Sequence, residues 1–247
     1  VAATLNISDS EFFNNRAGNG GAIYARYGQA NLFFSFARFT ENKAHYDGGA
    51  VQLDDGPKLV DHSSTYNMNT AGDYGGALFM YYNSHASFFN SSLVSNTAGD
   101  GGGGIDIRGI PGGFSFLDMS SVTLQSNKQI GGGTDRRYGG GGLLIYKVVI
   151  ANIRECTFIE NEATADSGSG KHGHQIYTSN DDSSIPSIAI VNTQFTHIAG
   201  DNAFYGYDQG SSTHGADKYV SPTTCSAEEP CSASPFTGTC ADLGNEG

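Results

Sequence analysis

Three charged residues have the types and the spacing that catalysis on an acidic substrate would need. Asp106 and Arg108 are separated by one residue, and Asp54 follows a similar short apolar segment earlier in the chain. In an extended strand, residues two apart point to the same face, so this carboxylate and guanidinium would lie together. Such a pair could hold a cation or withdraw a proton, or it could be a surface ion pair worth about 0 to 1 kcal/mol. The single acid at this place favours the second role, so we do not expect an enzyme.

Aromatic side chains accompany these charges at outward positions of similar apolar segments. Rings interleaved with Asp and Arg suit a polysaccharide, because rings stack on sugars and charged groups orient them. The alternative is that the rings are ordinary strand formers that cover the edge of the core. The candidate glycan-binding residues are Tyr24, Phe79, Tyr81, Tyr146, Tyr177 and Tyr205.

Two longer segments, residues 128–140 and 164–174, carry the other candidate contact residues. They are insertions relative to the sequence repeat described next, and insertions in repeat proteins often gather on the binding face. We expect a protein or glycan partner to contact Arg136, Arg137, Tyr138 and His172. His172 and His174 could hold a metal ion, but a His pair on a Gly- and Ser-rich segment favours solvent, so we predict no metal site.

These candidates are distributed over a sequence repeat. An aromatic residue or Leu is followed three residues later by Asn, and the first four copies are 27 residues apart. Later steps are 31 and 34 residues. The recurring asparagines are Asn15, Asn42, Asn69, Asn96, Asn127 and Asn161. We expect their amides to form a ladder, each one bonded to the repeat above and below.

A second marker, Gly-Gly-Ala or Gly-Gly-Gly, runs in register with the first. It occupies residues 20–22, 48–50, 75–77, 102–104 and 140–142, and an alternating apolar segment follows each copy. Asn19, Asp47, Asp73 and Asp100 lie just before the glycines. Asn and Asp are favoured turn residues. These residues are therefore expected to form turns; the alternative is that the acidic ones among them bind calcium.

The repeat predicts an all-β fold, a parallel β-helix of about seven coils. A unit of about 27 residues with two or three short strands cannot bury its apolar face alone, so neighbouring units must stack. Glycine makes up 35 of the 247 residues, which disfavours helices. We expect residues 1–207 to form the β-helix and residues 208–247 to form an irregular tail or cap stapled by disulfides.

The paired motif, Gly-Gly-Ala with an aliphatic residue and Phe-x-x-Asn, resembles the repeat of the chlamydial polymorphic outer membrane proteins. It covers about residues 5–207. The resemblance implies a surface adhesin, and together with the usual crossover preference it implies a right-handed β-helix. Other β-helices are pectate lyases, in which acids on a sheet bind calcium and an Arg or Lys takes the proton. By that likeness, Asp106, Arg108 and Asp54 would have those roles.

Charge and hydropathy limit the partners. The net charge of −12 would repel a phosphate backbone, which excludes nucleic acid. No segment approaches the roughly 20 apolar residues of a membrane span, and the first residues lack the pattern of a signal peptide. We therefore expect a processed, secreted chain. Sequons at Asn6 and Asn90 predict N-glycosylation.

The four cysteines are unevenly placed. Cys225, Cys231 and Cys240 lie in the tail without His partners, which favours disulfides in an oxidising compartment. Cys156 takes a position that small residues occupy in other repeats, which favours a buried thiol. The third tail cysteine would then pair with another chain; the alternative is that it pairs with Cys156.

These patterns favour a non-enzymatic extracellular β-helix with a structural or adhesive role in a surface or fibrous assembly. Leu5 and Ile7 are directed inward in the first coil with no polar cap before them. We therefore expect either preceding chain or end-to-end stacking of another subunit there. The alternatives are a lyase-like enzyme and a glycan-binding module for acidic polysaccharide.

Overall fold

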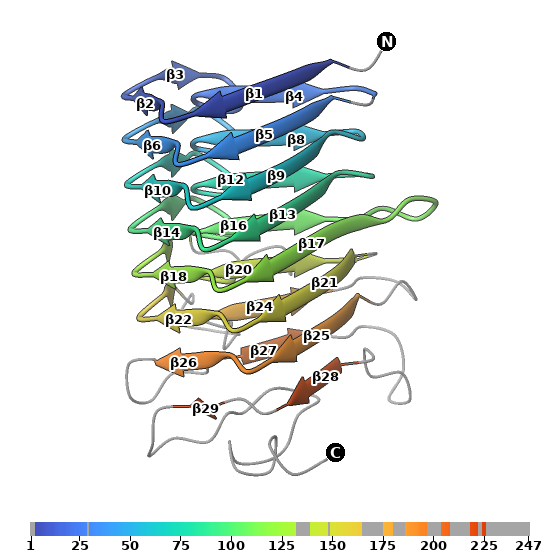
Figure 1. Ribbon diagram of the computed structural model, residues 1–247. Helices are drawn as coiled ribbons and strands as arrows, with labels where there is room; N and C mark the ends of the chain where they lie inside the picture. Colours follow the sequence, from blue (N-terminus) through green and yellow to red (C-terminus); the bar gives the residue numbers. More distant parts are fainter. Residues whose placement is uncertain are drawn as a thin grey trace.

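The computed structural model is a tall stack of strands with the N-terminus at one end (Figure 1). It describes residues 3–28, 30–131, 139–147, 149–164, 175–179, 186–196, 204–207, 218–221 and 224–225. These residues form strands and turns and contain no helix. No helix that could span a membrane is found in them.

Every coil contributes strands to parallel sheets that run the length of the stack, here called sheets A to D. Sheet A has eight strands. They are β1 (Thr4–Ser8), β5 (Asn31–Ser35), β9 (Lys58–His62), β13 (His85–Phe89), β17 (Ser115–Ser120), β21 (Val149–Arg154), β25 (Ser187–Val191) and β28 (Lys218–Ser221).

Sheet B also has eight strands, and sheet C is made of six two-residue strands. Sheet B consists of β2 (Glu11–Phe13), β6 (Arg38–Thr40), β10 (Thr65–Asn67), β14 (Ser92–Val94), β18 (Thr123–Gln125), β22 (Thr157–Ile159), β26 (Gln194–Thr196) and β29 (Thr224–Cys225). Sheet C consists of β3 (Arg16–Ala17), β7 (Lys43–Ala44), β11 (Thr70–Ala71), β15 (Thr97–Ala98), β19 (Lys128–Gln129) and β23 (Glu162–Ala163).

Sheet D follows each glycine pair and carries the candidate site. Its seven strands are β4 (Ile23–Arg26), β8 (Val51–Asp54), β12 (Leu78–Tyr81), β16 (Ile105–Arg108), β20 (Leu143–Tyr146), β24 (Ile176–Ser179) and β27 (Phe204–Tyr207). In Figure 1 the strands of sheet A run in front and those of sheet D behind as the chain descends, which makes a right-handed coil. The predicted right-handed parallel β-helix is confirmed.

The strands pair in the register that the repeat predicts, so like residues stack on like. Leu5 pairs with Leu32, and Leu32 with Leu59. The aromatic position of the repeat stacks in the same way: the rings of Phe12 and Phe39 lie 4.9 Å apart and those of Phe39 and Tyr66 lie 4.8 Å apart. Inward columns of this kind bury the apolar residues in one continuous core.

The asparagines form a hydrogen-bonded column inside the stack. Asn42 donates from its backbone N and its Nδ2 to Oδ1 of Asn69, at 3.0 and 2.9 Å, and its Nδ2 also donates to the carbonyl of Phe12 at 2.9 Å. The same pattern joins Asn15, Asn42, Asn69, Asn96, Asn127 and Asn161. Below them Asn161 donates to the Gln175 side chain, so Gln175 continues the column where the repeat has no seventh asparagine.

An acidic residue occupies one inward position of sheet A. Asp61 is fully buried, and its carboxylate accepts hydrogen bonds from the hydroxyl groups of Tyr66 and Ser91. Burial raises the pKa of the Asp61 carboxyl, and these donors counteract the rise. The acid is tolerated because its oxygens have partners within the core.

The stack extends into the segment that the sequence predicts to be an irregular tail. Strand β28 pairs with β25, and β29 pairs with β26. Cys231 and Cys240 lie outside the described residues, and of Cys225 only the backbone is described. Cys156 is a buried thiol, and burial raises its pKa to about 11.

Candidate binding site on sheet D

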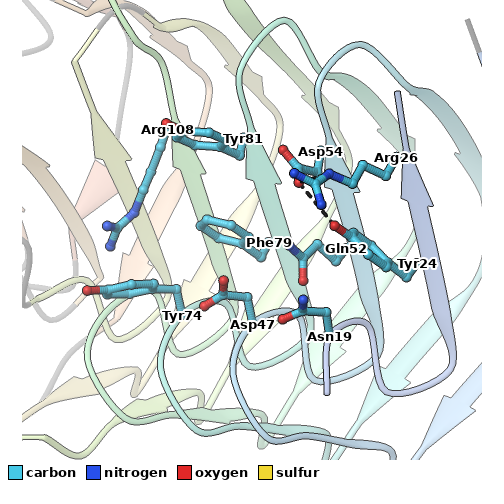
Figure 2. Close-up of a pocket in the computed structure, with 10 residues that line it drawn as sticks. All are labelled: Asn19, Tyr24, Arg26, Asp47, Gln52, Asp54, Tyr74, Phe79, Tyr81 and Arg108. Atoms are coloured by element: carbon cyan, nitrogen blue, oxygen red, sulfur yellow. Dashed lines mark hydrogen bonds and ion pairs between the residues drawn. The ribbon is translucent and has the colours of Figure 1, made fainter. Parts of the chain in front are cut away.

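A pocket of about 390 Å³ opens on the outer face of sheet D, in the part of the stack nearest the N-terminus (Figure 2). It lies over the first four strands of the sheet. The residues that line it are Asn19, Tyr24, Arg26, Asp47, Gln52, Asp54, Tyr74, Phe79, Tyr81 and Arg108.

Two kinds of position supply these side chains. Outward residues of β4, β8, β12 and β16 form the floor, since alternate residues of a strand point to the same face. Asn19, Asp47 and Tyr74 come from the corners just before the glycines. Gly48 and Gly75 have φ angles of +64° and +67°. A side chain at either position would be strained, so glycine permits the turn that brings each corner residue beside the sheet.

The two residues predicted as catalytic candidates form a closed ion pair. Nε and Nη2 of Arg108 donate to the two Asp106 carboxylate oxygens at 2.8 and 2.9 Å. Asp106 is 0% exposed and Arg108 is 6% exposed, so this is a buried pair rather than a surface one. The Arg108 guanidinium lies 3.5 Å from the centre of the Tyr74 ring, which covers it. Both carboxylate oxygens of Asp106 therefore already accept a hydrogen bond from Arg108.

The third candidate, Asp54, is engaged at the opposite end of the pocket. Nε of Arg26 lies 3.0 Å from Oδ2 of Asp54, and the hydroxyl of Tyr24 donates to the same oxygen at 3.1 Å. The Arg26 side chain is about half exposed, so this pair is a surface ion pair. Asp54 and Asp106 do not converge on one point of the pocket.

Two residues that line the pocket each have a buried oxygen without a hydrogen-bond partner. These oxygens are Oε1 of Gln52 and Oδ1 of Asp47. Gln52 is 4% exposed as a residue. Only one other buried side-chain oxygen or nitrogen in the described part of the chain lacks a partner, and it belongs to Gln129. Figure 2 shows Tyr74, Asp47 and Asn19 along one edge of the pocket, with Gln52 in the neighbouring row between Phe79 and Tyr24.

The Asp47 carboxyl has a strongly perturbed pKa. Burial raises this pKa to about 7, and the negative charge of Asp106 adds to the rise, while the charge of Arg108 counteracts it. The folded state therefore holds the Asp47 proton more tightly than the unfolded chain does. By linkage, this group makes the protein less stable as the pH rises from about 4 to about 7.

We predict that Asp47→Asn removes this part of the pH dependence. The free energy of unfolding is measured for both proteins by chemical denaturation from pH 4 to 8. The value for the variant should increase relative to that of the parent as the pH rises. The gain should reach a few kcal/mol at most, because one pKa unit corresponds to about 1.4 kcal/mol. Asp9→Asn, at an exposed aspartate outside the pocket, is the matched control. Parallel pH profiles for Asp47→Asn and the parent would contradict the assignment.

The structure separates the predicted glycan-binding residues into two groups. Tyr24 is 39% exposed and Tyr81 is half-buried, and both line the pocket. Phe79 also lines the pocket but is only 5% exposed, so its ring supports the neighbouring rings and offers little surface to a ligand. Tyr146 and Tyr177 are 8% and 1% exposed and pack with Leu144 in a small cluster of their own, so they present no ring face to a ligand. For Tyr205 only the backbone is described.

The remaining predicted positions are distributed elsewhere. Asn6 and Asn90 are exposed, and Asn90 lies in a corner with a φ of +55°. The proposed partner patch of Arg136, Arg137, Tyr138 and His172 lies outside the described residues. Across the ranges described above, no three His, Cys, Asp or Glu side chains are grouped as a metal site would require.

Comparisons with known proteins bear on the repeat. A family model described as the Chlamydia polymorphic membrane protein repeat matches residues 9–26. This stretch contains Phe12, Asn15 and the first Gly-Gly-Ala, so it includes both halves of the motif. No curated protein and no solved structure matches the chain. The resemblance to this repeat is confirmed.

Proposed function

We propose that the chain is a non-enzymatic, surface-exposed β-helix with an adhesive or structural role in an extracellular assembly. The matched repeat supports this, because the family that carries it consists of membrane proteins of Chlamydia, and adhesion at the cell surface is the role that the resemblance implies. A stack of coils has long side faces that suit contacts with other molecules.

The non-enzymatic part of the proposal rests on the interactions of Asp106 and Asp54, the two acids that a lyase would use. Both oxygens of Asp106 accept from Arg108, and Oδ2 of Asp54 contacts Arg26 and Tyr24. Calcium would have to displace a guanidinium from Asp106, and Arg108 would have to leave its carboxylate to take a proton. A lyase mechanism at these residues would therefore begin by breaking a buried ion pair, which is costly.

Two measurements test the proposal. Polygalacturonate and alginate, each with added calcium, should give no rise in the ultraviolet absorbance of unsaturated products when the purified chain is added. Antibodies to the chain should label intact cells that carry it without permeabilisation. Turnover that is lost in Asp106→Asn would establish the lyase instead, and labelling only after permeabilisation would refute a surface role.

A further inference from the structure

We infer that the pocket on sheet D binds an uncharged sugar ring, which packs against the aromatic side chains and donates its hydroxyl groups to Gln52 and Asp47. The inference deepens the proposed adhesive function, because it names the ligand class and the place where that ligand binds. It also changes the expected ligand from acidic polysaccharide to a neutral glycan.

The hydrogen-bonding groups point to a ligand that donates. Oε1 of Gln52 and Oδ1 of Asp47 are buried acceptors without partners. Leaving such a group unsatisfied is costly, so native structures rarely keep one without a ligand or a water to fill it. Asp47 and Gln52 line the same pocket, and sugar hydroxyls are donors that can satisfy two neighbouring acceptors at once.

The aromatic rings supply the apolar half of such a site. Phe79 is 5% exposed and forms the buried base of this wall, on which the half-buried Tyr81 packs with an interplanar angle of 12° and centroids 6.3 Å apart. The rings of Tyr74 and Phe79 are 5.9 Å apart at 29°. Tyr24, at the other side of Gln52, exposes 39% of its surface. Ligand sites combine an apolar wall with a few placed polar groups in just this way, and the C–H face of a sugar ring fits such a wall.

The charges of the pocket argue against a charged ligand. Both arginines already contact carboxylates, Arg26 with Asp54 and Arg108 with Asp106. A uronate carboxylate would thus meet no uncommitted guanidinium, and it would lie near Asp47. A cationic ligand would meet the Arg108 guanidinium above Tyr74. An uncharged polyol ring avoids both the repulsion from Asp47 and the repulsion from Arg108.

The test uses the full chain and a panel of named probes. Methyl glycosides of glucose, galactose and mannose, N-acetylglucosamine and their short β-linked oligomers are titrated by calorimetry and by NMR, with a galacturonate oligomer as the charged comparison. We expect saturable binding of at least one neutral probe and weaker binding of the galacturonate. Tyr24→Ala and Gln52→Leu should each weaken the neutral probe about tenfold or more, as loss of one ring contact or one hydrogen bond predicts.

The controls separate binding from folding. Phe33→Ala removes a similarly exposed ring from sheet A, outside the pocket, and should leave the affinity unchanged. Gln52→Leu should not lower the melting temperature, because the oxygen that it removes has no partner in the protein. A structural role for Gln52 would instead lower both the affinity and the melting temperature.

Three results would overturn the inference. The first is that no neutral probe binds and the pocket holds solvent only, and the second is that the galacturonate oligomer binds more tightly than every neutral probe. The third is that Tyr24→Ala and Phe33→Ala bind the neutral probe with equal affinity. The labelling of intact cells is independent of these results. If intact cells are labelled but no sugar binds, only this inference is contradicted. If a sugar binds but the protein is never exposed on cells, only the proposed function is contradicted.

Discussion

Replacing Gly76 by Ala is expected to prevent the chain from folding, although it adds one methyl group. A Cβ at this position would lie 2.6 Å from N and 2.7 Å from C of Thr97, and closer still to the carbonyl oxygen of Gly103. All three are backbone atoms of the next coil and belong to the hydrogen-bonded stack. Overpacking typically costs about 1–3 kcal/mol where neighbours can shift, and here the neighbours are fixed backbone. We expect insoluble or unfolded protein by circular dichroism.

Gly18→Ala is the matched control in the same type of chain segment. A Cβ at Gly18 has no heavy atom within 4 Å. This variant should fold and melt at the parental temperature or slightly above it, because Ala restricts the unfolded chain more than Gly does. Similar melting curves for Gly76→Ala and Gly18→Ala would contradict the close backbone contact between Gly76 and the next coil.

Asn96→Ala is expected to have the second largest effect, a loss of about 3–5 kcal/mol in the free energy of unfolding. Asn96 is 0% exposed. Its Oδ1 accepts from the backbone N and Nδ2 of Asn69 at 3.0 and 2.9 Å, and its Nδ2 donates to Asn127 and to the carbonyl of Tyr66 at 2.9 Å. The truncation leaves these groups buried and unpaired, with a cavity beside them.

The end of the same column provides the control for Asn96. Asn15 donates to Asn42 at 2.8 Å but is itself exposed, so water can replace what Asn15→Ala removes. We expect a loss of about 1 kcal/mol or less for this variant. Chemical denaturation measures both. Equal losses at Asn15 and Asn96 would show that burial within the stack does not determine the contribution of the column.

The period of the sequence was enough to predict the fold. Asn42, Asn69 and Asn96 recur at 27 residues, and the strands pair at that same offset. Stacking is the way such a repeat can satisfy both its amides and its apolar residues. The longer steps to Asn127 and Asn161 do not disturb the column, because Asn96 still donates to Asn127 at 2.9 Å and Asn127 to Asn161 at 2.8 Å.

The pocket was only partly predictable, for a geometric reason. Tyr24, Phe79 and Tyr81 follow from strand alternation, which identifies outward residues. Asp47 was recognised as a turn residue, and Tyr74 was not singled out at all. Their place beside the sheet depends on the positive φ of the following glycines, which a sequence pattern does not specify. A residue just before each glycine pair is the signal that could have identified both.

The ion pairs show the same limit. Spacing alone places Asp106 beside Arg108, and Arg26 beside Asp54 in the next coil. It does not tell which pair is buried. In the buried pair the Tyr74 ring covers Arg108, a contact that depends on the tertiary path of the corner. Catalytic and structural interpretations of Asp106 could not be separated without that contact.

The most direct test of the stacked register is a pair of engineered disulfides. Thr65 of β10 and Ser92 of β14 are direct partners in adjacent coils, whereas Val94 is the partner of Asn67. Under mild oxidation, Thr65→Cys/Ser92→Cys should form a disulfide between its two new cysteines, seen by non-reducing peptide mapping, and Thr65→Cys/Val94→Cys should not. Crosslinking of the second pair in preference to the first, or of neither pair, would contradict the coil-on-coil arrangement on which the column, the pocket and the proposed function depend.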